Sequence, residues 1–86
     1  MKYIMFWEYP RGNTETLEKA QSQLQQALNA NNQPFEFEGE IIETPKQIPG
    51  DWVEREQGEQ RFYVRPISRG DISAYFPSHQ FIIEVE

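Results

Sequence analysis

One stretch of this 86-residue chain has the period of an amphipathic helix, while most of the remainder alternates with the period of a strand. The apolar side chains of that stretch recur at three- and four-residue spacing: Leu17, Ala20, Leu24, Ala27 and Leu28. This spacing predicts one main helix over about 14–30. Asn13 or Thr14 is the expected N-cap, and Pro34 prevents the helix from continuing. The apolar stripe is narrow, so we expect the helix to pack on one face of a sheet.

Strands are predicted on both sides of the helix. Residues 3–9 are apolar on both alternating faces, which is typical of a central strand covered on both faces. Pro10, Arg11 and Gly12 are expected to end this strand. Residues 35–43 alternate between apolar and acidic side chains, which predicts a half-buried strand with one acidic face.

The second half of the chain is also predicted to be mainly strand. Residues 52–56 and 61–67 form a hairpin pattern around Gln57-Gly58-Glu59. Asp51 followed by Glu54 resembles a capping box, so a short helix over 52–57 is the alternative. A single helical turn is expected around Ile72–Phe76, and residues 80–86 alternate again as a final strand.

This order of elements predicts a single α+β domain over residues 1–86. The expected architecture is ferredoxin-like: an antiparallel-rich sheet of four or five strands, one main helix at about 14–30 and a reduced second helix. The opening segment Met1-Lys2-Tyr3-Ile4-Met5-Phe6-Trp7-Glu8-Tyr9-Pro10, followed by a helix from Thr14, resembles small dimeric α/β-barrel proteins such as the muconolactone-isomerase-like group. The resemblance is confined to the first strand and helix. It implies a homodimer in which two sheets pair across a two-fold axis.

Composition excludes several classes of site. The chain has no cysteine and one histidine, which excludes disulfides, thiolate metal sites, thiol catalysis and a multi-histidine metal site within one chain. No phosphate-binding glycine loop or metal motif is present, so no cofactor is expected. The net charge of −6 argues against binding nucleic acid or an anionic membrane. The apolar run at the N-terminus is too short for a signal peptide or membrane span, so a cytoplasmic protein is expected.

The negative charge is concentrated in one segment. Residues 36–59 contain 8 acidic and 2 basic side chains, whereas the rest of the chain has 6 of each. This imbalance favours a non-catalytic binding or regulatory module that docks a basic protein partner. The predicted partner-binding residues are Glu36, Glu38, Glu40, Trp52, Glu54 and Glu56. For Trp52 the alternative is a lid folded over the sheet. A solvated acidic face without a partner is the alternative interpretation.

A small basic cluster supports a rival hypothesis. Arg61, Tyr63 and Arg65 share one face of the expected strand, where they either bind an anion or pair with glutamates. The resemblance to dimeric α/β barrels implies a small ligand-binding protein or enzyme with a pocket between sheet and helix. In that hypothesis Arg65 holds a carboxylate and His79 moves a proton. No nucleophile–base pair accompanies them, so binding is favoured over catalysis.

Overall fold

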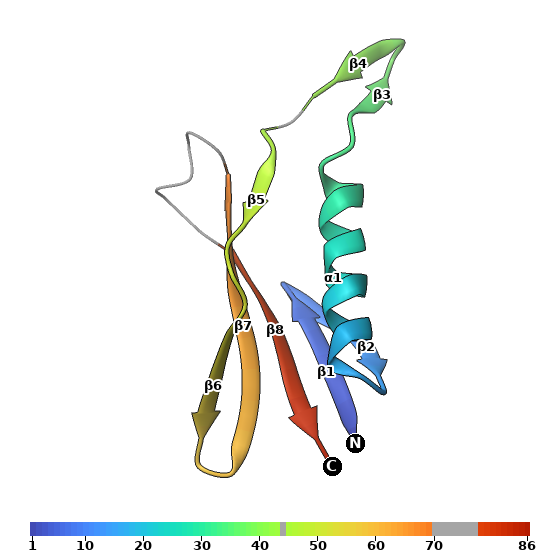
Figure 1. Ribbon diagram of the computed structural model, residues 1–86. Coiled ribbons are helices and arrows are strands. Elements are labelled where there is room, and N and C mark those ends of the chain that lie inside the picture. The colour runs from blue at the N-terminus through green and yellow to red at the C-terminus, as the bar shows by residue number, and fades with distance from the viewer. Residues whose placement is uncertain (44, 70–77) are drawn as a thin grey trace.

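The computed structural model describes residues 1–43, 45–69 and 78–86, and Figure 1 shows their arrangement. The elements in chain order are β1 (Lys2–Trp7), β2 (Tyr9–Thr14), α1 (Leu17–Asn31), β3 (Phe35–Phe37), β4 (Glu40–Ile42), β5 (Gln47–Pro49), β6 (Val53–Gln57), β7 (Gln60–Arg69) and β8 (Ser78–Val85). Six strands form one sheet in the order β2-β1-β8-β7-β5, and β6 also pairs with β7. The strands β3 and β4 form a separate two-stranded sheet.

The long strand β7 has two neighbours on the same edge. Its first half pairs with β6, from Gln60 to Val64, and its end pairs with β5, from Ile67 to Arg69. The change of partner occurs at Pro66, whose carbonyl oxygen accepts a 2.8 Å hydrogen bond from the backbone N–H of Gly50. A Cβ atom at Gly50 would lie 2.7 Å from the Cγ of Pro66, so this close approach requires glycine.

The helix packs across one face of the sheet, as its narrow stripe predicted (Figure 1). The buried apolar residues of the described chain form one cluster: Met5, Trp7, Ala20, Leu24, Leu28, Ile67 and Ile82. The N-cap prediction was wrong by two or three residues. Thr16 has an extended backbone, and its hydroxyl accepts a hydrogen bond from the N–H of Lys19. The hydroxyl of Thr14 instead donates to the carbonyl of Thr16, just before the helix.

The ferredoxin-like prediction was wrong. The described strand pairs are all antiparallel, as expected, but in a ferredoxin-like fold the strand after the first helix lies in the same sheet as the strand before it, whereas β3 pairs with β4 outside the main sheet. The sheet also has six strands where four or five were expected, and a second small sheet lies outside it. The predicted second helix around Ile72–Phe76 lies outside the described residues.

Two local differences account for the extra strands. The chain turns at Glu8, which has a positive φ of 67°, and residues 9–14 continue as β2 instead of ending the sheet. Residues 35–43 do not form one strand, because Glu38 and Gly39 both adopt positive φ and fold the segment into the β3–β4 hairpin. Such a pair of positive-φ residues is typical of a tight hairpin turn.

The remaining predictions of local structure can be compared directly. Residues 53–57 are a strand, so the hairpin with β7 is confirmed and the short-helix alternative is excluded. The last predicted strand is confirmed as β8. Over the described part of the chain, no helix combines the length and the apolar character that a membrane span requires.

Candidate functional site

The β3–β4 hairpin is the part of the acidic segment that is most clearly separated from the core. It extends beyond the C-terminal end of α1, well away from the six-stranded sheet (Figure 1). Three of its large apolar side chains are exposed: Phe35, Phe37 and Ile41. Ile41 retains 75% of its accessible surface. Isolated surface hydrophobics are common, but three on an eight-residue hairpin are a high local density, with Phe35 and Phe37 on one face and Ile41 on the other.

Acidic side chains are interleaved with these apolar groups. The pairing of Glu36 with Ile41 and of Phe37 with Glu40 places an apolar group directly opposite each carboxylate. Glu38 lies at the turn, where all neighbouring side chains are exposed. We define the hairpin surface as residues 35–42. It therefore presents negative charge and apolar area together, with the outer edges of both strands unpaired within the described structure.

Two hydrogen bonds hold the base of the hairpin to the body of the protein. The side chain of Asn32, at the end of α1, donates to the carbonyl of Gln47 and accepts from its N–H, each at 2.8 Å. These bonds join the start of β5 to the end of the helix, so they hold together the two ends of the segment that contains the hairpin. A hollow of about 430 Å³ lies beside this anchor and is lined partly by Phe35, Gln33 and Arg69.

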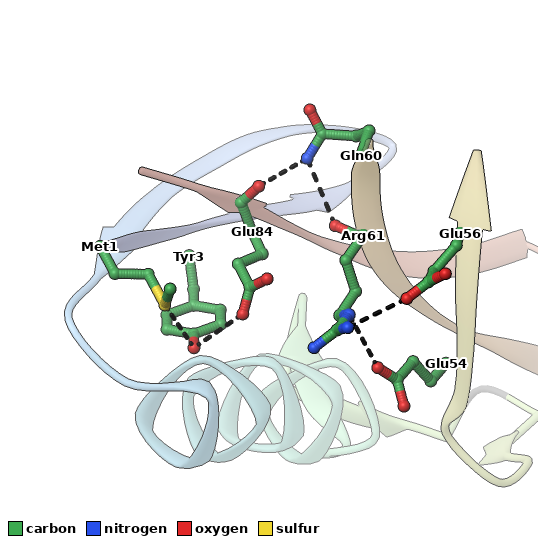
Figure 2. A network of polar contacts seen from close by, with 7 residues as sticks. All are labelled: Met1, Tyr3, Glu54, Glu56, Gln60, Arg61 and Glu84. Carbon is green, nitrogen blue, oxygen red and sulfur yellow. Dashed lines mark hydrogen bonds and ion pairs between the residues drawn. The ribbon is translucent and has the colours of Figure 1, made fainter. Parts of the chain in front are cut away.

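The other predicted acidic residues lie elsewhere. Glu54 and Glu56 belong to β6, at the end of the molecule opposite to the hairpin (Figure 1). Both pair with Arg61 at 3.0 Å, as Figure 2 shows. These bonds and charges raise the pKa of Arg61 above its ordinary value, with the hydrogen bond to Glu56 contributing most. Both carboxylates are therefore engaged with Arg61 within the chain, which offsets one of their two charges.

The same polar row continues across the sheet. Tyr3 donates a 3.1 Å hydrogen bond to the carboxylate of Glu84, and Glu84 lies beside Arg61 (Figure 2). Desolvation and this hydrogen bond raise the pKa of the Tyr3 hydroxyl above 10.0. The pKa of Tyr63 is also raised, mainly by desolvation and then by the charge of Glu54. The row links β1, β8, β7 and β6 on the side of the sheet that carries the helix.

Trp52 and Arg65 form a second cluster, inside the protein. The Arg65 guanidinium lies 4.7 Å from the centre of the Trp52 ring, and Trp52 is half-buried against the core. Trp52 thus covers Arg65 and is not exposed beside the glutamates that the sequence grouped with it. Arg65 is 5% exposed, and burial lowers its pKa. Its partners among the described residues are the amides of Gln80 and Gln25.

His79 lies on the opposite face of the sheet from Arg65. Gln80 points toward the helix, where it meets Arg65, whereas His79 contacts the ring of Phe81 at a centroid distance of 6.1 Å. His79 is exposed and borders a shallow hollow that Phe6, Phe81 and Ile83 also line. The two residues that the ligand-binding hypothesis combined are therefore separated by the sheet and do not share a pocket.

Sequence reasoning identified the hairpin acids but missed two features of their setting. The first is the positive-φ turn at Glu38-Gly39, which an acidic residue followed by glycine between apolar residues signals. The second is the apolar half of the surface, because Phe35, Phe37 and Ile41 were expected to face the core. Within residues 1–43, 45–69 and 78–86, no three potential metal-ligating side chains come together.

Comparison with known proteins adds no family assignment. No protein-family model matches the chain, and neither curated proteins nor solved structures gave a match.

Proposed function

We propose that this protein is a binding module that captures a basic, partly apolar segment of another protein through the hairpin surface. The observation that carries the proposal is the interleaving of Glu36, Glu38 and Glu40 with exposed Phe35, Phe37 and Ile41 on a hairpin held away from the core. Carboxylates that point into solvent give long-range attraction, and exposed aromatic and aliphatic groups give short-range affinity.

The backbone of the hairpin favours an extended partner segment. The strands β3 and β4 pair with each other alone among the described strands, so each has an outer edge with free N–H and C=O groups. A peptide that adds to such an edge gains main-chain hydrogen bonds, while its alternate side chains meet those of the hairpin. Alternating basic and apolar residues on the peptide would match the alternation of Glu36 and Phe37.

The test uses a defined probe, a fluorescent peptide of alternating Lys and Val, with a Lys and Ser peptide as comparison. We expect binding of the Lys and Val peptide that weakens as salt is added, because salt screens exposed charges beyond about 8 Å at physiological ionic strength. The triple variant Glu36→Gln, Glu38→Gln and Glu40→Gln should lose this binding. The variant Ile41→Ser should lose affinity without changing the salt dependence.

A charge-matched control separates this surface from general acidity. The triple variant Glu15→Gln, Glu59→Gln and Glu86→Gln removes the same charge from exposed sites outside the hairpin. It should bind the peptide as the unmodified protein does. Equal loss of binding in both triple variants would show attraction to net charge alone, and the proposal would be abandoned.

A further inference from the structure

The face of the six-stranded sheet opposite α1 is apolar over four neighbouring strands. We call it the open face, and its apolar residues are Ile4, Phe6, Val53, Phe62, Val64, Phe81 and Ile83. The register aligns them in two rows across the strands. One row runs from Ile4 through Ile83 to Phe62, and the other runs from Phe6 through Phe81 and Val64 to Val53.

No described element covers this face. The helix packs on the other side, and the hairpin lies beyond the end of the helix (Figure 1). The open-face residues are half-buried by one another, and Val53 and Phe81 each keep 38% of their accessible surface. A shallow hollow of about 560 Å³ lies between Phe6, Phe81 and Ile83 and the turn at Glu8–Pro10. The sequence pattern of β1 predicted a strand covered on both faces, and the described residues of one chain cover only one of them.

Charge is distributed unevenly between the two faces. On β6 the acidic residues Glu54 and Glu56 point to the helix side, where they meet Arg61, which leaves Val53 and Arg55 on the open face. Glu84 of β8 likewise faces the helix side and bonds to Tyr3. The chain has 14 acidic residues, but none of them lies at a position of β1, β6, β7 or β8 that points to the open face. This arrangement keeps acidic side chains out of a contact between two copies and so lowers the repulsion across it.

The size of the open face fits a small dimer interface. Four strands about 4.8 Å apart and six residues long at about 3.3 Å each span roughly 400 Å² in projection. The relief of the side chains and an apolar group at the margin of the face, Val85, add to the accessible area. Stable interfaces begin at about 600 Å² per partner. Sheets that stack face to face bury such side chains in an interface about 10 Å thick.

We propose that two copies of this chain stack through their open faces as an isologous homodimer. The two-fold axis lies in the plane between the two sheets and is perpendicular to the strands. It places β1 of one copy over β1 of the other, and the two strands run in opposite directions. Lys2, at the start of β1, then approaches Glu8 of the second copy, which follows the end of β1. Opposite charges at the two ends of one patch make it complementary to itself.

The test is the molar mass in solution, measured by sedimentation over a concentration series. We expect the 86-residue chain to be dimeric at micromolar concentration. Phe81→Glu and Val53→Glu, which place a charge at the centre and at the margin of the open face, should each shift the dissociation constant at least 100-fold toward monomer. The control Ile41→Glu adds the same charge to the hairpin and should leave the dimer intact.

Several results would overturn the proposal. One is a monomer at all concentrations, which leaves the open face to another occupant, and another is a dimer that survives both Phe81→Glu and Val53→Glu. Circular dichroism shows whether each variant is folded. If Phe81→Glu does not fold, Val53→Glu at the margin of the sheet decides whether the open face forms the dimer interface. Lys2→Glu should weaken the dimer and Lys2→Glu with Glu8→Lys should restore it; failure of this rescue would overturn the proposed axis. The peptide test of the hairpin surface is independent of these results.

Discussion

The Nε of Arg65 donates a 2.6 Å hydrogen bond to the Oε1 of Gln80, and both side chains are buried between the sheet and the helix. The amide of Gln80 in turn donates to the carbonyl of Leu24 at 3.1 Å, which ties β7 and β8 to the middle of α1. A guanidinium in this position is held by neutral amides and by the face of Trp52. The interior therefore contains a polar bridge between the sheet and the helix.

Removal of one member of this bridge should be more costly than removal of both. We expect Arg65→Met to lower the free energy of unfolding by about 1–3 kcal/mol, because it leaves the buried oxygen of Gln80 without its donor. The double variant Arg65→Met with Gln80→Leu should recover most of this loss, since the buried Oε1 of Gln80 that lost its donor is then removed too. Urea denaturation of the two single variants and the double variant measures the coupling, and strictly additive losses would contradict the bridge.

Packing of the helix depends on Leu24, which is 1% exposed. Leu24→Ala should cost about 2–5 kcal/mol through lost burial and the cavity left behind. That loss is large relative to the stability of a domain of this size. Gln26→Ala, on the exposed side of the same helix, is the control and should stay within about 0.5 kcal/mol. Equal urea midpoints for the two variants would be incompatible with the observed packing.

The junction of β5, β6 and β7 should not tolerate a side chain at Gly50. Gly50→Ala places a Cβ atom 2.7 Å from the Pro66 ring, and we expect a loss of about 1–3 kcal/mol from overpacking. Combining it with Pro66→Ala removes the ring and should relieve most of the cost. Asp51→Ala, at the exposed neighbouring position, serves as the control. Thermal unfolding of these three variants, compared with the unmodified chain, decides whether the steric conflict is real.

Alkaline pH should destabilise the protein through its tyrosines. The folded-state pKa values of Tyr3 and Tyr63 lie above 10.0, so their contribution to stability is complete below pH 10.0 and is lost as the pH rises through the folded-state values. The double variant Tyr3→Phe and Tyr63→Phe should lose less stability over this range than the unmodified chain. Tyrosinate absorbance, compared with that of Tyr3→Phe, gives the midpoint for Tyr3. A titration midpoint of Tyr3 at or below pH 10.0 would show that burial and the hydrogen bond to Glu84 do not raise the pKa of this hydroxyl.

Much of the local structure could be predicted because its determinants are close together in the chain. The spacing of Leu17, Leu24 and Leu28 locates the helix and its buried face. The β6–β7 hairpin is equally local, because its strands are joined by two residues that include Gly58 in the left-handed region. The acids at 36–40 were correctly placed on a strand-like segment, although its turn was missed.

The candidate site was less predictable because it depends on contacts between distant parts of the chain. The sequence grouped Trp52, Glu54 and Glu56 with the hairpin acids because they share one acidic stretch. In the folded protein Trp52 covers Arg65, while Glu54 and Glu56 neutralise Arg61. Whether a charge is free for a partner depends on its neighbours in space, which composition does not report.

The sequence by itself determined the period of each segment, and with it the helix, most of the strands and the two-sided apolar character of β1. Only the tertiary structure decided how those strands pair. A two-residue period states which side chains share a face but not which strand lies beside it, because the backbone hydrogen bonds of a sheet are the same for every sequence. The open face therefore depends on the pairing of Ile4 with Ile83, which joins strands from the two ends of the chain. In the same way, the burial of Arg65 depends on its hydrogen bond to Gln80, 15 residues further along the chain.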